Sequence, residues 1–124
     1  MVPEVIVRYY ALGIKEDISC NLSLYSENNS NVISFESDKC VLKIVLKDIV
    51  DLEEFYNLLT KKEKKAMIYC FMKKEDKEYK GLRKIVWKND ALAVSQGGIR
   101  MEFEKDIQDK ILESIKIIKN KLGI

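Results

Sequence analysis

The sequence lacks histidine altogether, and only one proline and five glycines interrupt its 124 residues. Without histidine, the chain has neither the commonest general acid or base nor the commonest metal ligand of proteins. The scarcity of proline and glycine leaves no segment with the composition of a flexible linker. No apolar run approaches the roughly 20 residues that a membrane-spanning helix needs. We therefore expect a single domain, residues 1–124, that is not an enzyme and holds no metal or cofactor.

Cysteine is also scarce, and its spacing argues against a metal site. Cys20, Cys40 and Cys70 form no C-x-x-C pair, whereas a structural zinc ion usually needs about four Cys or His ligands. Each cysteine lies in an apolar run, which is typical of a buried reduced thiol. Reduced thiols, together with an N-terminus that does not resemble a signal peptide, predict a cytoplasmic protein.

The chain also lacks a large net charge, because its 22 basic side chains are nearly balanced by 20 acidic ones and the net charge is +2. A general basic field that would attract nucleic acid is therefore absent, and such binding would need a local patch. Apolar residues make up 47% of the chain, which is enough to build a substantial core.

Period-two alternation and β-branched residues predict most of the chain to be strand. The expected strands are 4–12, 17–25, 32–36, 40–47, 80–88, 91–96 and 98–103. Asn89-Asp90 and Gly97-Gly98 are typical of hairpin turns. Apolar residues that recur on one face predict helices over 48–60 and 104–122.

The segment over residues 61–75 is ambiguous. Thr60 and Glu63 fit the S/T-x-x-E capping box, which favours a second helix. Residues 66–72 form an unbroken apolar run (AMIYCFM), which favours a strand buried on both faces.

A short internal repeat decides between these alternatives. Lys47-Asp48-Ile49-Val50-Asp51 and Lys105-Asp106-Ile107-Gln108-Asp109 each follow a predicted strand and begin a predicted helix. If residues 66–73 are a strand, residues 1–60 and 61–124 each contain four strands and then a helix. We therefore predict an α+β fold of antiparallel sheets in tandem ββββα units, with a long C-terminal amphipathic helix. The alternative interpretation is that the two helices begin with similar capping sequences and that the chain contains no duplication.

Basic and aromatic residues interleave along the strands, on faces that we expect to point away from the core. Single-stranded nucleic acid binds to such surfaces through stacked bases and neutralised phosphates. Lysines that protect strand edges and a tryptophan in the core would explain the same pattern without binding. The candidate binding residues are Arg8, Tyr10, Lys43, Lys47, Arg83, Lys84, Trp87, Lys88 and Arg100.

The last predicted helix is apolar enough to contact both its own sheet and a partner subunit, so we expect a homodimer or a higher homo-oligomer. The alternative function is a protein-interaction or chaperone-like adaptor that uses this helix and exposed strand edges. The candidate interface residues are Ile111, Ile115, Ile117, Ile118 and Leu122.

The two K-D-I-x-D helix starts and the strand runs before them resemble the architecture of the Whirly family and the PUR-repeat proteins. Lys80-Gly81-Leu82-Arg83-Lys84 is a partial counterpart of the Lys-Gly-Lys-Ala strand motif of the Whirly family. The resemblance implies two units that fold together, associate through their helices and bind single-stranded DNA or RNA on their sheets. Single-stranded DNA or RNA binding without catalysis is therefore the leading functional hypothesis.

Overall fold

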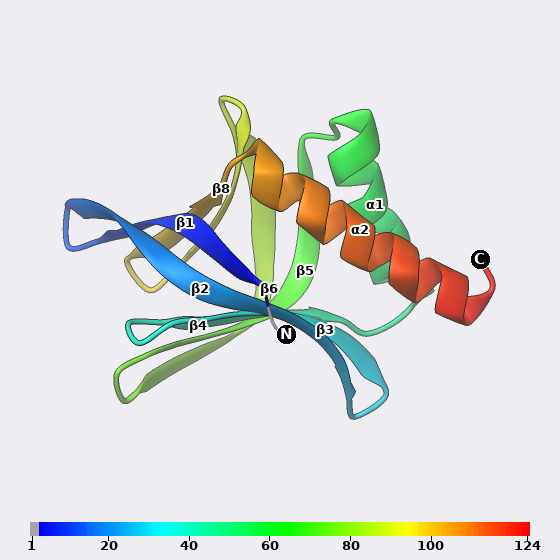
Figure 1. Ribbon diagram of the computed structural model, residues 1–124, viewed down its shortest axis with the longest axis horizontal. Helices are drawn as coiled ribbons and strands as arrows, with labels where there is room; N and C mark the ends of the chain where they lie inside the picture. Colours follow the sequence, from blue (N-terminus) through cyan, green and yellow to red (C-terminus); the bar gives the residue numbers. More distant parts are fainter. Residues whose placement is uncertain (1–2) are drawn as a thin grey trace.

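A computed structural model describes residues 3–124, which form eight strands and two helices (Figure 1). Each expected strand and helix is present, with boundaries that differ by a few residues. In chain order they are β1 (Glu4–Ala11), β2 (Ile14–Glu27), β3 (Ser30–Glu36), β4 (Val41–Leu46), α1 (Ile49–Lys61), β5 (Lys65–Lys74), β6 (Lys77–Lys88), β7 (Ala91–Gln96), β8 (Ile99–Phe103) and α2 (Lys105–Leu122).

The strands form one closed antiparallel barrel, in which each strand pairs with the next and β1 pairs with β8. The prediction of antiparallel sheets in tandem ββββα units is therefore wrong, although the mixture of strands and helices is right. The reason is that β4 pairs with β5 across the α1 connection, with Leu42 opposite Met72. Arg8 lies opposite Glu102 where the barrel closes. Closure leaves no free edge among the described strands, so the adaptor hypothesis loses its exposed strand edges.

The ambiguous segment is a strand, as the repeat predicted. β5 pairs with β4 on one side and with β6 on the other. Helix α1 ends at Lys61, and its C-cap, Lys62, has a left-handed φ of 54°. Thr60 does not cap a second helix, because its hydroxyl donates to the carbonyl of Tyr56 within α1, at 2.8 Å.

The core lies inside the barrel, between the inward side chains of the strands and the apolar faces of the helices. In Figure 1, α1 and α2 lie together on one side, while the β1–β2 and β5–β6 hairpins project away from them. Phe35 on β3 and Phe103 on β8 stack across the interior, with ring centroids 4.7 Å apart. Within residues 3–124, no helix combines the length and apolar character needed to cross a membrane.

The two copies of the repeated string do not begin their helices in the same way. Asp48 is the N-cap of α1 and accepts from the amide of Asp51, at 3.0 Å. Asp51 in turn accepts from the amide of Lys47, at 2.9 Å. The N-cap of α2 is Glu104, so Asp106 lies within the first helical turn. The duplication of residues 1–60 and 61–124 stays a hypothesis.

Candidate nucleic-acid interface

Partly exposed aromatic rings and lysines gather on the outer face of the barrel over β2, β4 and β5. Residues paired directly across antiparallel strands point to the same face. Lys43 lies opposite Phe71, and Val45 lies opposite Tyr69, with side chains that alternate with the buried ones. We call this surface the lysine–ring groove and define it by Tyr25, Lys43, Lys47, Tyr69 and Phe71.

The lysines of the lysine–ring groove lie over the ring faces. The Lys43 ammonium is 5.9 Å from the ring centroid of Tyr25 and 5.4 Å from that of Phe71. The Lys47 ammonium is 3.9 Å from the ring centroid of Tyr69. A side-chain hydrogen bond with Tyr25 is the largest cause of the raised pKa of Lys43. A depression of about 550 Å³ runs along Lys43, Lys47, Tyr69 and Phe71 and continues past Glu27 to the turn between β2 and β3.

A second set of candidate residues meets where β1 pairs with β8. Arg100 lies opposite Tyr10, and its guanidinium carbon is 4.0 Å from the centroid of the Tyr10 ring. Arg8 forms an ion pair with Glu104, which is the largest cause of the raised pKa of Arg8. These side chains line a depression of about 370 Å³ that also includes Lys88 and the carboxylates of Asp90, Glu102 and Glu104. We call it the arginine groove and define it by Arg8, Tyr10, Lys88 and Arg100.

The buried carboxylate of Glu102 contacts three of the side chains that define the arginine groove, Arg8, Tyr10 and Arg100. Glu102 is 4% exposed although it is on the outer face, because larger side chains cover it. Its Oε1 accepts from Arg8 Nη1 at 3.5 Å and from the Tyr10 hydroxyl at 3.4 Å. Its Oε2 is 2.9 Å from Arg100 Nε, an ion contact without hydrogen-bond alignment. The carboxylate therefore positions the cations around the Tyr10 ring.

Two candidate residues on β6 point inward instead. Trp87 lies opposite the buried Leu92, and its indole Nε1 donates to the carbonyl of Leu58 on α1 at 3.3 Å. Arg83 lies opposite the buried Ile68. The interleaved pattern therefore includes one aromatic side chain that packs against the core and one cation outside the binding face. Lys84, which lies between them in the sequence, is exposed.

The candidate interface residues on α2 divide into two groups. Ile111, Ile115 and Ile118 are at most 2% exposed within this chain. They contribute to the protein's own core and are not available to a partner, because α2 uses this face to close the barrel. Ile117 and Leu122 are exposed, and Leu122 lies beside a depression.

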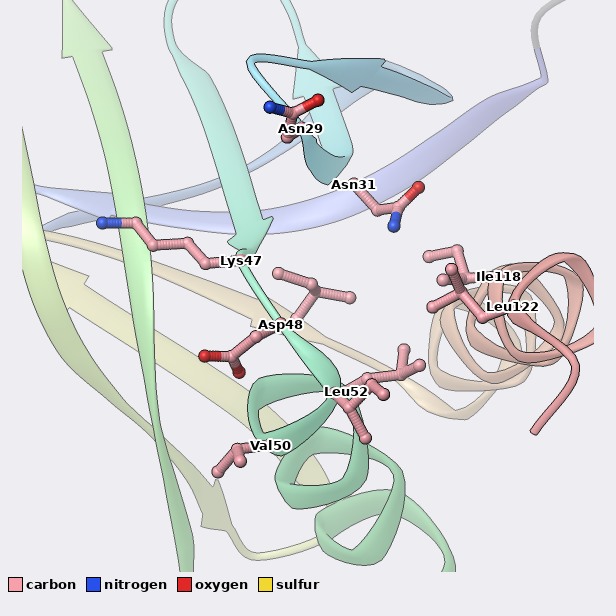
Figure 2. A pocket seen from close by; sticks show the side chains of 10 residues that line it. Asn29, Asn31, Lys47, Asp48, Val50, Leu52, Ile118 and Leu122 are labelled. Atoms are coloured by element: carbon pink, nitrogen blue, oxygen red, sulfur yellow. The ribbon is translucent and has the colours of Figure 1, made fainter.

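That depression, the helix-end groove, has a volume of about 390 Å³ and lies between the first turn of α1 and the last turns of α2. Figure 2 shows Val50 and Leu52 on one side, Ile118 and Leu122 on the other, and Asn29 and Asn31 from the β2–β3 hairpin above them. The Lys47 side chain points away from this groove, toward β5.

Sequence reasoning missed the rings of Tyr69 and Phe71. Both lie in the apolar run of β5, where alternation is invisible because neither face carries a charge. The available signal was finer: the aromatic side chains occupy alternate positions, 69 and 71, and the smaller Cys70 lies between them. Among residues 3–124, no three His, Cys, Asp or Glu side chains gather as a metal site.

Comparison of the chain with protein-family models, with curated proteins and with solved structures finds no match. The resemblance to the Whirly family and the PUR-repeat proteins therefore stays a prediction, and the site is interpreted from its own geometry.

Proposed function

We propose that this protein binds single-stranded DNA or RNA on the outer face of the barrel and performs no reaction on it. The observation that carries the proposal is the lysine–ring groove. There, Tyr25, Tyr69 and Phe71 are partly exposed and two lysine ammoniums lie over their faces. Stacking of one base on one such ring contributes about 1–3 kcal/mol, whatever the base.

The lysines supply the phosphate contacts. Each ammonium sits at the end of a flexible four-carbon stem, so it can move from a ring face to a phosphate when a base takes its place. Because the net charge of the chain is only +2, affinity depends on this local arrangement. Three buried free thiols support a cytoplasmic location.

Fluorescence anisotropy with labelled oligo(dT) and oligo(rU) tests the proposal. We expect binding at 50 mM salt that weakens as salt rises, with a log–log slope of about −0.7 for each phosphate neutralised. Replacing Tyr69 by leucine should weaken binding about 5- to 150-fold through the lost stacking. No binding at 50 mM salt would remove the proposal.

Tyr56 offers a matched control on a different face. The Lys119 ammonium lies 3.9 Å from the ring centroid of Tyr56, the same separation as between Lys47 and Tyr69. Tyr56→Leu should leave oligonucleotide binding unchanged. An equal loss in both variants would show that the lysine–ring groove is not the site.

A protein-interaction adaptor is the second candidate function, and the helix-end groove favours it. Ile49, Val50 and Leu122 line this groove and are 52%, 71% and 50% exposed. The same surface is the candidate site of homo-oligomer formation. Sedimentation velocity at increasing protein concentration tests self-association, with Val50→Asp as the disrupting variant and Ile117→Asp as the control. Wild-type protein that stays monomeric and binds no oligonucleotide would favour a different protein partner.

A further inference from the structure

We propose that the ligand is an extended strand several nucleotides long, which crosses the barrel from the lysine–ring groove to the arginine groove. This inference rests on the proposed function and adds the path and the minimum length of the ligand. It depends on the register of the strands between the two grooves, since register decides which side chains lie next to one another on the outer face.

The register places cations and rings in a row that runs across the strands. Met67, two residues before Tyr69 on the same face, lies opposite Lys84 on β6. Ile85 on β6 lies opposite Val94 on β7. One residue further along each strand, Lys84 and Ser95 therefore face each other on the outer face. Ser95 lies opposite Arg100, and Arg100 lies opposite Tyr10. Lys84 therefore lies between the two grooves.

The charges along this row favour a polyanion. Lys47, Lys84 and Arg100 are its ionisable members apart from the ring hydroxyls, and each is a cation. Of the carboxylates that line the arginine groove, Glu102 is 4% exposed and in contact with Arg8 and Arg100. Glu104 forms an ion pair with Arg8, and Asp90 also lines the groove. A strand that passes over Glu102 meets guanidinium groups rather than that carboxylate, and it runs beside the ion pair of Arg8 and Glu104.

Each end of the row has the same construction, a cation over a ring face. Lys47 lies over Tyr69 at one end, and Arg100 lies over Tyr10 at the other, at 3.9 and 4.0 Å from the ring centroids. A base that stacks at either end displaces a cation toward the adjacent phosphate. An intervening lysine without a ring, Lys84, contacts the backbone between two stacked bases.

The length of the row sets the length of a ligand that follows it, whereas the opposite way round, through β3 and β2, β4 and β1 are three steps apart. From β4 to β1 through β5, β6, β7 and β8 there are five steps between adjacent strands, which amount to about 24 Å at the usual spacing of about 4.8 Å. Strand-binding barrels of comparable size accommodate about 4 nucleotides or more. A mononucleotide or dinucleotide therefore reaches one groove and not both.

Anisotropy competition with oligo(dT) of 2, 4, 6 and 8 nucleotides tests the path. We expect affinity to rise steeply up to about four to six nucleotides and then to level off. Lys84→Gln and Arg100→Gln should each reduce the salt slope for the 8-mer by about 0.7 and leave the dinucleotide unaffected. Lys77→Gln, at the far end of the same strand as Lys84, should leave the 8-mer slope unchanged. Circular dichroism checks that each variant is folded.

The possible failures are distinguishable. If no oligonucleotide binds, the proposed function fails together with the path. If the 8-mer binds and depends on Tyr69, but with the affinity of the dinucleotide or with salt slopes unchanged in Lys84→Gln and Arg100→Gln, the function stands and the path is overturned.

Discussion

The stacked pair of Phe35 and Phe103 tests the closed core directly, because β3 and β8 are not neighbours in the barrel. The two rings have centroids 4.7 Å apart and an interplanar angle of 28°, and both are buried. Leucine refills most of the volume of either ring. Each single Phe→Leu substitution should therefore lower the free energy of unfolding by about 1–2 kcal/mol, less than the roughly 3–5 kcal/mol of truncation to alanine.

The double variant, Phe35→Leu with Phe103→Leu, tests the contact between the two rings more directly than either single variant. A stacked aromatic pair contributes about 0.5–1.5 kcal/mol beyond the area it buries. Either single substitution removes that contribution, so Phe35→Leu with Phe103→Leu should cost about 0.5–1.5 kcal/mol less than the sum of the two. Urea unfolding followed by circular dichroism measures these values, with an unchanged m-value as the sign of an unchanged unfolding transition.

Phe55 on α1 provides the control, because it is equally buried but is not part of the stacked pair. Phe35→Leu and Phe55→Leu should be additive to within about 0.3–0.5 kcal/mol. If the Phe35 and Phe103 substitutions are additive to the same degree, the rings do not meet, and the arrangement of β3 and β8 around a shared core is refuted.

Three further predictions concern stability. Leu12 has a φ of 53°, is 89% exposed and precedes Gly13, which has a φ of 75°. Leu12→Asn creates the Asn-Gly pair that such turns favour. This substitution should raise the free energy of unfolding by about 0.5–1 kcal/mol. A lower urea midpoint would contradict this. Asp48→Ala should lower that free energy by about 1 kcal/mol because it removes the N-cap of α1, whereas its repeat counterpart Asp106→Ala should cost less, and equal losses would contradict the different capping. Burial raises the pKa values of the Cys20, Cys40 and Cys70 thiols from 9.0 to about 11, 11 and 12. Because the thiols of the unfolded chain lose their protons at lower pH, the free energy of unfolding should fall as pH rises from about 9 to 12. At pH 8, a thiol reagent should label the protein only after it unfolds. Rapid labelling of native protein would contradict the burial of the thiols.

The local elements were predictable because each strand and helix carries its own pattern. Alternation is visible in β2, where Ile18, Cys20 and Leu22 are buried and the residues between them are exposed. Barrel closure was not predictable in the same way. The pairing of Arg8 with Glu102 depends on the twist and length of every strand between them, and no local pattern records it.

The candidate site was predictable only in part, for a related reason. Lys43 and Arg100 alternate with apolar neighbours, so their outward direction follows from the sequence. Trp87 was misplaced because β6 contains a glycine, Gly81, with a φ of 147°, and little alternation to show which face is buried. The Tyr69 ring was missed because an apolar run hides its own periodicity.

The pairing of β1 with β8 also constrains how the chain folds. Arg8 and Glu102 are 94 positions apart, so the barrel closes only through one of the longest-range contacts that the chain contains. Such contacts are expensive in loop entropy and slow to form. During synthesis, the outer edge of β1 has no partner until β8 has emerged from the ribosome, and an unpaired strand edge is a template for intermolecular pairing. The folded barrel has no free strand edge among the described strands, but the nascent chain exposes the edge of β1. Correct folding therefore depends on protection of that edge until β8 is available.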